Sequence, residues 1–117
     1  MQVNALTIVN CVFGLATAGT ALVGLIRPQA FSHSALIGPG EQMYSRMYAA
    51  RAVPLGLAAA LPPFAWEGAP VATVLGVAAI AQVADVVIGI RNHEFGMTIG
   101  AGIAAIVHVA CAISIIL

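Results

Sequence analysis

The chain has 117 residues and no net formal charge; 62% of its residues are hydrophobic and only 7% are charged. This composition excludes an ordinary soluble domain, in which roughly 25% of residues are charged. A neutral chain also offers no basic surface for nucleic acid. With a mean hydropathy of +1.05, the chain is predicted to be an integral membrane protein.

Four apolar segments are each close to the roughly 20 residues that cross a bilayer core. They are predicted to be transmembrane helices at about 5–26, 42–61, 70–90 and 97–117. The predicted fold class is therefore all-α, an integral membrane bundle of four transmembrane helices that makes a single domain over residues 1–117. No basic residue precedes the first segment and no small-residue cleavage site follows it, which favours a retained helix over a signal peptide.

The connection after the first helix begins at Pro28. Its first part, PQAFSHSALI at 28–37, is mildly amphipathic and is expected to lie flat on the cytoplasmic surface. The tripeptide GPG at 38–40 is expected to break the chain just before the second helix.

The basic residues predict the orientation of the helices. Arg27, Arg46 and Arg91 lie at or near the first and third connections, whereas the second connection and both termini carry no Lys or Arg. The positive-inside rule therefore places those two connections in the cytoplasm and both termini on the non-cytoplasmic side. Trp66, in the second connection, suits the headgroup level on that outer side.

The second helix carries two arginines in an otherwise apolar setting. Arg46 lies near the membrane edge, from which its side chain reaches headgroups, but Arg51 lies about 13 Å deep at 1.5 Å per residue. An isolated charge in the membrane costs at least about 2.5 kcal/mol. Asp85, about 8 Å from the same end of the third helix, is the only acid inside a predicted span and is expected to pair with Arg51. Pro54 lacks an N–H and is predicted to kink the second helix beside Arg51.

Polar residues at helical spacing predict which faces point inward, because positions three, four and seven apart share one side of a helix. Each predicted helix presents one polar stripe among small residues, which indicates a bundle interior with room for water or a ligand. The stripes contain Thr7, Asn10, Gly14 and Thr17, then Glu41, Tyr44, Tyr48 and Arg51, then Gln82, Asp85, Gly89 and Asn92, and finally His108.

These stripes define a candidate catalytic group. We expect Asp85 to act as general acid or base, and Arg51 to orient it and to stabilise developing negative charge. Tyr48 or Tyr44 is expected to hold the opposite end of a polarised C–O bond, with His108 slightly deeper in the bundle. The expected substrate-binding residues are Tyr44, Gln82, Thr17, Asn10 and Arg46. The alternative is structural: a buried ion pair that fixes helix register, with hydrogen bonds between helices around it.

Two runs of sequence carry a resemblance to a known family. They are GTALVGLIRP from Gly19 to Pro28 and YAARAVPLGL from Tyr48 to Leu57. In these runs the chain resembles DoxX-like small membrane proteins, which include short four-helix families without assigned activity. The resemblance implies the four-helix fold more than any reaction.

The set of carboxylate, arginine and tyrosine resembles the site of cofactor-independent epoxide hydrolases of the limonene type, a likeness of site and not of fold. We therefore expect an enzyme that opens an epoxide of a lipophilic small molecule by hydrolysis or cyclisation, or that isomerises a double bond. Two alternatives stay open. One is a proton-coupled small transporter in which Asp85 and His108 exchange protons; the other is a non-enzymatic membrane subunit.

The expected partners are a lipophilic small molecule and the lipid bilayer, with no nucleic acid and no cofactor. No metal site is expected, because His33, His93 and His108 do not cluster at ligand spacing. Cys11 and Cys111 are expected to be small buried side chains that lie near the same membrane face. The small residues Gly14, Ala18, Gly96 and Gly100 at four-residue spacing allow close helix contact, and they leave a homo-oligomer as an open option.

Overall fold

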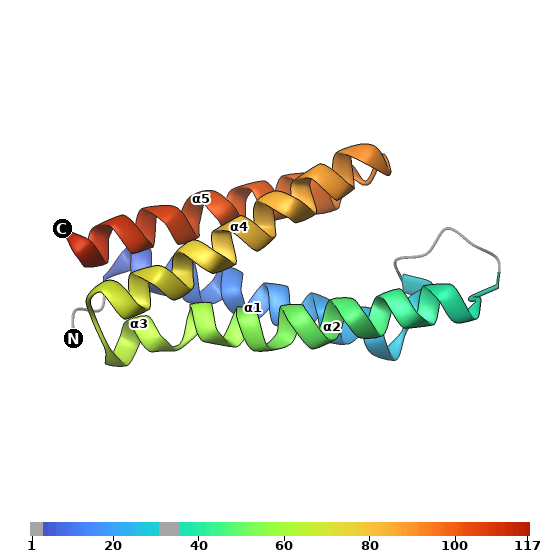
Figure 1. Ribbon diagram of the computed structural model, residues 1–117, viewed down its shortest axis with the longest axis horizontal. Helices are drawn as coiled ribbons and strands as arrows, with labels where there is room; N and C mark the ends of the chain where they lie inside the picture. Colours follow the sequence, from blue (N-terminus) through green and yellow to red (C-terminus); the bar gives the residue numbers. More distant parts are fainter. Residues whose placement is uncertain (1–3, 31–35) are drawn as a thin grey trace.

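The computed structural model describes residues 4–30 and 36–117, and within these ranges the chain is all-α with four long helices (Figure 1). The long helices are α1 (Ala5–Ile26), α2 (Pro39–Ala60), α4 (Ala69–Arg91) and α5 (Phe95–Ile116). Two short helical segments, η1 (Pro28–Ala30) and α3 (Pro62–Ala65), lie in the connections. The predicted all-α bundle is confirmed, and the predicted bounds of the first helix match those of α1.

Three of the described helices, α1, α4 and α5, are long and apolar enough to cross a membrane. The chain is therefore a multi-pass integral membrane protein. Helix α2 has the same 22-residue length as α1 but is not among these three, because Glu41, Arg46 and Arg51 make it more polar. The most polar helix of the bundle is thus the one that carries the predicted cation of the site.

The four long helices form two antiparallel hairpins, α1 with α2 and α4 with α5 (Figure 1). Between the hairpins, α1 contacts α5 and α2 contacts α4. Figure 1 shows the start of α1 and the end of α5 at the same end of the bundle as α3, where the two hairpins lie together. Toward the opposite end the two hairpins diverge. At that opposite end, the α1–α2 hairpin extends beyond the turn between α4 and α5.

Helices α1 and α2 pack backbone against backbone at Gly14 and Gly56. A Cβ atom on Gly14 would lie 2.7 Å from the carbonyl oxygen of Gly56, and one on Gly56 would lie 2.6 Å from the carbonyl oxygen of Gly14. Buried Ala18 lies beside this contact. Small residues let helices approach closely in membranes, where the hydrophobic effect does not drive one helix onto another. The contact predicted for Gly14 and Ala18 therefore forms within the chain, whereas Gly96 and Gly100 face open space in the described structure.

The start of α2 differs from the prediction. Gly38 is the residue that precedes the helix, and Pro39 is its first residue, so α2 begins three positions earlier than the predicted residue 42 and includes Gly40. Proline suits the first helical position, because the N–H that it lacks has no partner there and its fixed φ fits the helix. The helix continues through Pro54 to Ala60.

Two further predictions concern the first connection and the cysteines. Residues 31–35 of the predicted surface segment lie outside the described residues, and Pro28–Ala30 forms the short helical turn η1. Both cysteines are free thiols. Cys111 is buried with Leu75 in the main apolar cluster, but Cys11 is only half-buried. The prediction that both cysteines are buried is therefore confirmed for Cys111 and wrong for Cys11.

Replacing Gly14 with alanine is expected to destabilise the bundle, because the new methyl group meets the Gly56 carbonyl oxygen. Overpacking of this kind costs about 1–3 kcal/mol. Gly19→Ala on the same helix is the matched control, since nothing lies within 4 Å of its Cβ position and alanine favours the helix by about 1 kcal/mol. Thermal unfolding in detergent, followed by circular dichroism, compares the two. Equal stability of the two variants would contradict the close contact.

Candidate functional site

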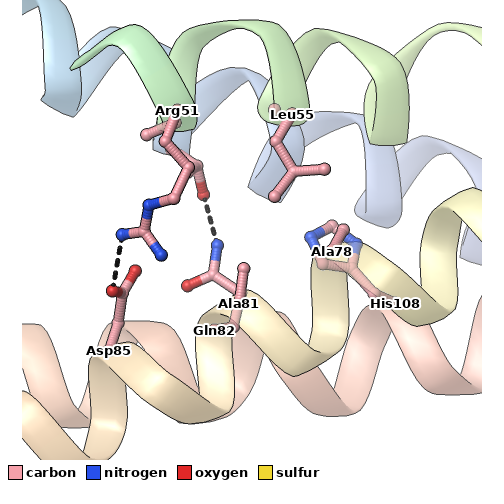
Figure 2. A pocket seen from close by; sticks show the side chains of 10 residues that line it. Arg51, Leu55, Ala78, Ala81, Gln82, Asp85 and His108 are labelled. Carbon is pink, nitrogen blue, oxygen red and sulfur yellow. Dashed lines mark hydrogen bonds and ion pairs between the residues drawn. The ribbon is translucent and has the colours of Figure 1, made fainter. Parts of the chain in front are cut away.

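An ion pair joins the two hairpins. Nη2 of Arg51 on α2 donates to Oδ1 of Asp85 on α4 over 2.8 Å (Figure 2). The side chain of Asp85 is 6% exposed, while that of Arg51 is 42% exposed. Arg51 Cζ also lies 5.5 Å from the centroid of the Tyr48 ring, one turn earlier on α2, a distance at which a guanidinium is attracted to the ring face. The predicted partner of Arg51 is confirmed, and the guanidinium lies at the edge of the bundle.

One turn along α4 from Asp85, buried Gln82 makes a second polar link between the hairpins. Its Nε2 donates to Oγ1 of Thr17 on α1 over 3.0 Å. The Thr17 hydroxyl in turn donates to the carbonyl oxygen of Phe13 over 3.0 Å. Gln82 is therefore held with its nitrogen toward α1, which leaves its Oε1 as an acceptor.

A third link connects α5, α1 and α2 through the buried side chains of His108 and Asn10. Nδ2 of Asn10 donates to the carbonyl oxygen of Ala59 over 2.8 Å, and Oδ1 of Asn10 lies 2.6 Å from Nδ1 of His108. Because an amide oxygen only accepts, the hydrogen of this bond sits on Nδ1 of His108. A neutral His108 ring then has Nε2 as its acceptor.

The carbonyl oxygen of Ala59 can accept from Asn10 because the residue four positions later is a proline. In an uninterrupted helix the carbonyl of residue 59 accepts from the N–H of residue 63, but that residue is Pro63, which has none. Asn10 supplies the missing donor. Pro63 is therefore the feature of the sequence from which this hydrogen bond could have been predicted.

The ion pair and Gln82 line a small cavity between the hairpins. Figure 2 shows Asp85, Gln82 and His108 in a row on one side, with Arg51 and Leu55 across from them. The volume open to the centre of a water molecule is about 10 Å³, which is room for about one water. The lining residues are Thr17, Arg51, Ala52, Leu55, Gly56, Ala78, Ala81, Gln82, Asp85 and His108.

This cavity brings together five of the nine predicted site residues and leaves four outside its lining. Tyr48 stacks on Arg51 without lining the cavity, and Asn10 touches it only through His108. Tyr44 is 68% exposed on α2. Arg46 lines a separate cavity near the start of α2. The apolar wall, including Leu55 and Ala78, was missed because it follows the hydrophobic pattern of any buried helix.

Within the described part of the chain, every buried polar side-chain atom has a hydrogen-bond partner. The same residues contain no group of three His, Cys, Asp or Glu side chains that could hold a metal ion. The polar groups that the described residues bring to this site are therefore an ion pair, two amides, a hydroxyl and an imidazole. Comparison of the chain with protein-family models, with curated proteins and with solved structures finds no match.

Replacing Asn10 with leucine is expected to destabilise the bundle, because it leaves the Ala59 carbonyl and the His108 ring without their partner. Each unsatisfied buried group costs roughly 1–3 kcal/mol. Thr20→Val, at an exposed position on the same helix, is the control. The measurement is thermal unfolding in detergent. If Asn10→Leu unfolds at the same temperature as Thr20→Val, the polar link does not stabilise the bundle.

Proposed function

We propose that the chain is a small integral membrane enzyme that uses Asp85, Arg51 and Tyr48 for cofactor-free acid–base chemistry on a lipophilic small molecule. The most specific form of this proposal is hydrolytic opening of an epoxide. It rests on one observation: a carboxylate held by an arginine borders a cavity with room for about one water.

The first step uses the water that this cavity has room for. Asp85 takes a proton from the water as the water oxygen attacks an epoxide carbon, and the C–O bond of the ring breaks. The Oε1 atom of Gln82 accepts a hydrogen bond from the O–H that the attacking water keeps, because Nε2 of Gln82 is engaged with Thr17. Arg51 holds Asp85 in position through its Nη2.

The second step neutralises the ring oxygen. The remaining N–H groups of Arg51 and the hydroxyl of Tyr48 stabilise the negative charge that develops there. The proton on Asp85 then passes to this oxygen, so that a diol leaves and the carboxylate is restored. Water and the epoxide are the only species consumed.

The size of the cavity constrains the substrate. A volume of about 10 Å³ does not take up a lipophilic molecule, so the body of the substrate stays in the bilayer and its reacting carbons approach at the half-exposed Arg51. Cyclisation by an internal hydroxyl, or isomerisation, would need the nucleophile or the double bond itself inside the bundle. The small cavity therefore favours hydrolysis among the expected reactions.

A non-enzymatic membrane subunit is the second candidate. The observation that favours it is that the buried polar atoms of the described residues all have partners, as a purely structural network requires. The resemblance to DoxX-like four-helix membrane proteins agrees with this candidate as well as with the first. On this view Arg51 and Asp85 only fix the hairpins against each other.

We also propose that both termini lie on the non-cytoplasmic side. In Figure 1 the start of α1 and the end of α5 share one end of the bundle with α3, and exposed Trp66 directly follows α3. Arg27 directly follows α1 and Arg91 is the last residue of α4, both at the ends that point the other way. The positive-inside rule supports this orientation.

Asp85→Asn is expected to lower the turnover of a lipophilic terminal epoxide by about 10²–10⁴-fold, because an amide cannot take the proton of the attacking water. Purified protein in detergent is incubated with the epoxide in ¹⁸O-labelled water, and labelled diol is measured by mass spectrometry. Glu67→Gln, an acid in the second connection, is the control. Full activity of Asp85→Asn with native helicity would exclude Asp85 as the base.

The double substitution of Arg51→Met with Asp85→Leu separates the two candidates. It removes both charges together, so no unpaired ion remains in the bundle, and a replaced ion pair is often neutral for stability. The enzyme proposal predicts a folded but inactive protein. If epoxide turnover is absent from the wild type too, and the double variant still retains any partner that co-purifies with the wild type, the structural candidate holds.

A further inference from the structure

We propose that a second cavity, at the end of the α1–α2 hairpin away from the termini, binds the phosphate group of an anionic phospholipid. This cavity has a volume of about 280 Å³, compared with about 10 Å³ for the one beside Asp85. Its described polar lining is Arg46, Gln42 and Gln29, and its apolar lining includes Leu25, Ile26 and Ile37. The proposal is independent of the enzymatic one, because the two cavities share no lining residue.

The polar lining matches a phosphate group. Arg46 is the cavity's charged residue among those described, and a guanidinium binds phosphate oxygens through paired N–H donors. Gln42 lies four positions before Arg46 and so on the same face of α2, and Gln29 faces them from η1. Both amides add N–H donors.

The charge of Arg46 is not neutralised by the residues that the structure describes. The ion pair found among them joins Arg51 to Asp85. Glu41 is five positions before Arg46, about 140° around the helix at 3.6 residues per turn. One of its carboxylate oxygens lies 3.5 Å from the backbone nitrogen of Gly38, at the start of α2. An anionic group in the cavity therefore meets an available guanidinium.

The position of the cavity along the bundle fits a headgroup. The membrane-span candidate α1 ends at Ile26, which lines the cavity. Arg46 lies five residues, or about 7.5 Å, nearer that end than Arg51, and each headgroup region is roughly 5–7 Å thick. Leu25 and Ile37 supply apolar surface for the glycerol backbone and the first acyl carbons. Figure 1 shows this end extending beyond the α4–α5 turn, where lipid can approach it.

The test is lipid binding to the purified full-length protein in detergent, measured by native mass spectrometry. The probe is dioctanoyl phosphatidylglycerol, with dioctanoylglycerol and inorganic phosphate as comparison ligands. We expect one retained phosphatidylglycerol, about tenfold weaker binding for Arg46→Gln, and partial retention for Arg46→Lys. Gln42→Leu is expected to weaken binding as well. Arg91→Gln removes a charge from the same end of the bundle without touching the cavity and is expected to bind normally.

Three results would overturn the proposal. An equal loss of phosphatidylglycerol binding in Arg46→Gln and Arg91→Gln would mean that positive charge at this end attracts lipid without a specific binding site. Retention of dioctanoylglycerol as strongly as phosphatidylglycerol would mean that the phosphate is not recognised. Complete displacement of the lipid by an equal concentration of inorganic phosphate would mean that the ligand is a free anion and not a lipid.

Discussion

The arrangement of the bundle depends on the cost of placing an arginine within a membrane. Arg51 lies well inside α2, and a lone charge within a membrane is unfavourable by at least about 2.5 kcal/mol. Asp85 removes that cost only if α2 and α4 lie side by side in one register, since the two groups meet at 2.8 Å. The pair therefore fixes how one hairpin sits against the other. Within the α1–α2 hairpin, by contrast, the small residues Gly14 and Gly56 bring the backbones together.

The interface between the hairpins changes character along its length. Near the start of α1 and the end of α5, an apolar cluster that includes Ala59, Leu75 and Cys111 packs beside the buried link between Asn10 and His108. The cavity between His108 and Asp85 follows, toward the end where the hairpins diverge (Figure 1). Because lipid tails are as apolar as the helices, the polar links carry more of the specificity here than in a soluble bundle.

The sequence predicted the parts of this structure that follow from composition and period. The first helix was predicted because an apolar run ends at Arg27 and Pro28, and the ion pair because Asp85 is the only acid inside a predicted span. The link from Asn10 to the Ala59 carbonyl was missed, although the proline that creates it is plain in the chain. The size of the cavity was not predictable, because periodicity identifies the inward face of a helix but not the distance between two helices.

The two arginines of α2, Arg46 and Arg51, lie at different depths in the bundle and have different surroundings. They lie five residues apart, about 140° around the helix, so Arg51 faces α4 while Arg46 faces the end of α1 and η1. The deeper guanidinium is met by a carboxylate of the same chain. The shallower one lines the cavity at the end of α1, and the anion that we propose for it is a lipid phosphate. From the sequence, Arg46 was expected both to reach headgroups from the membrane edge and to bind substrate; in the structure it lines a cavity separate from the one beside Asp85. The depth of each arginine along α2, and not its chemical type, separates the two positions.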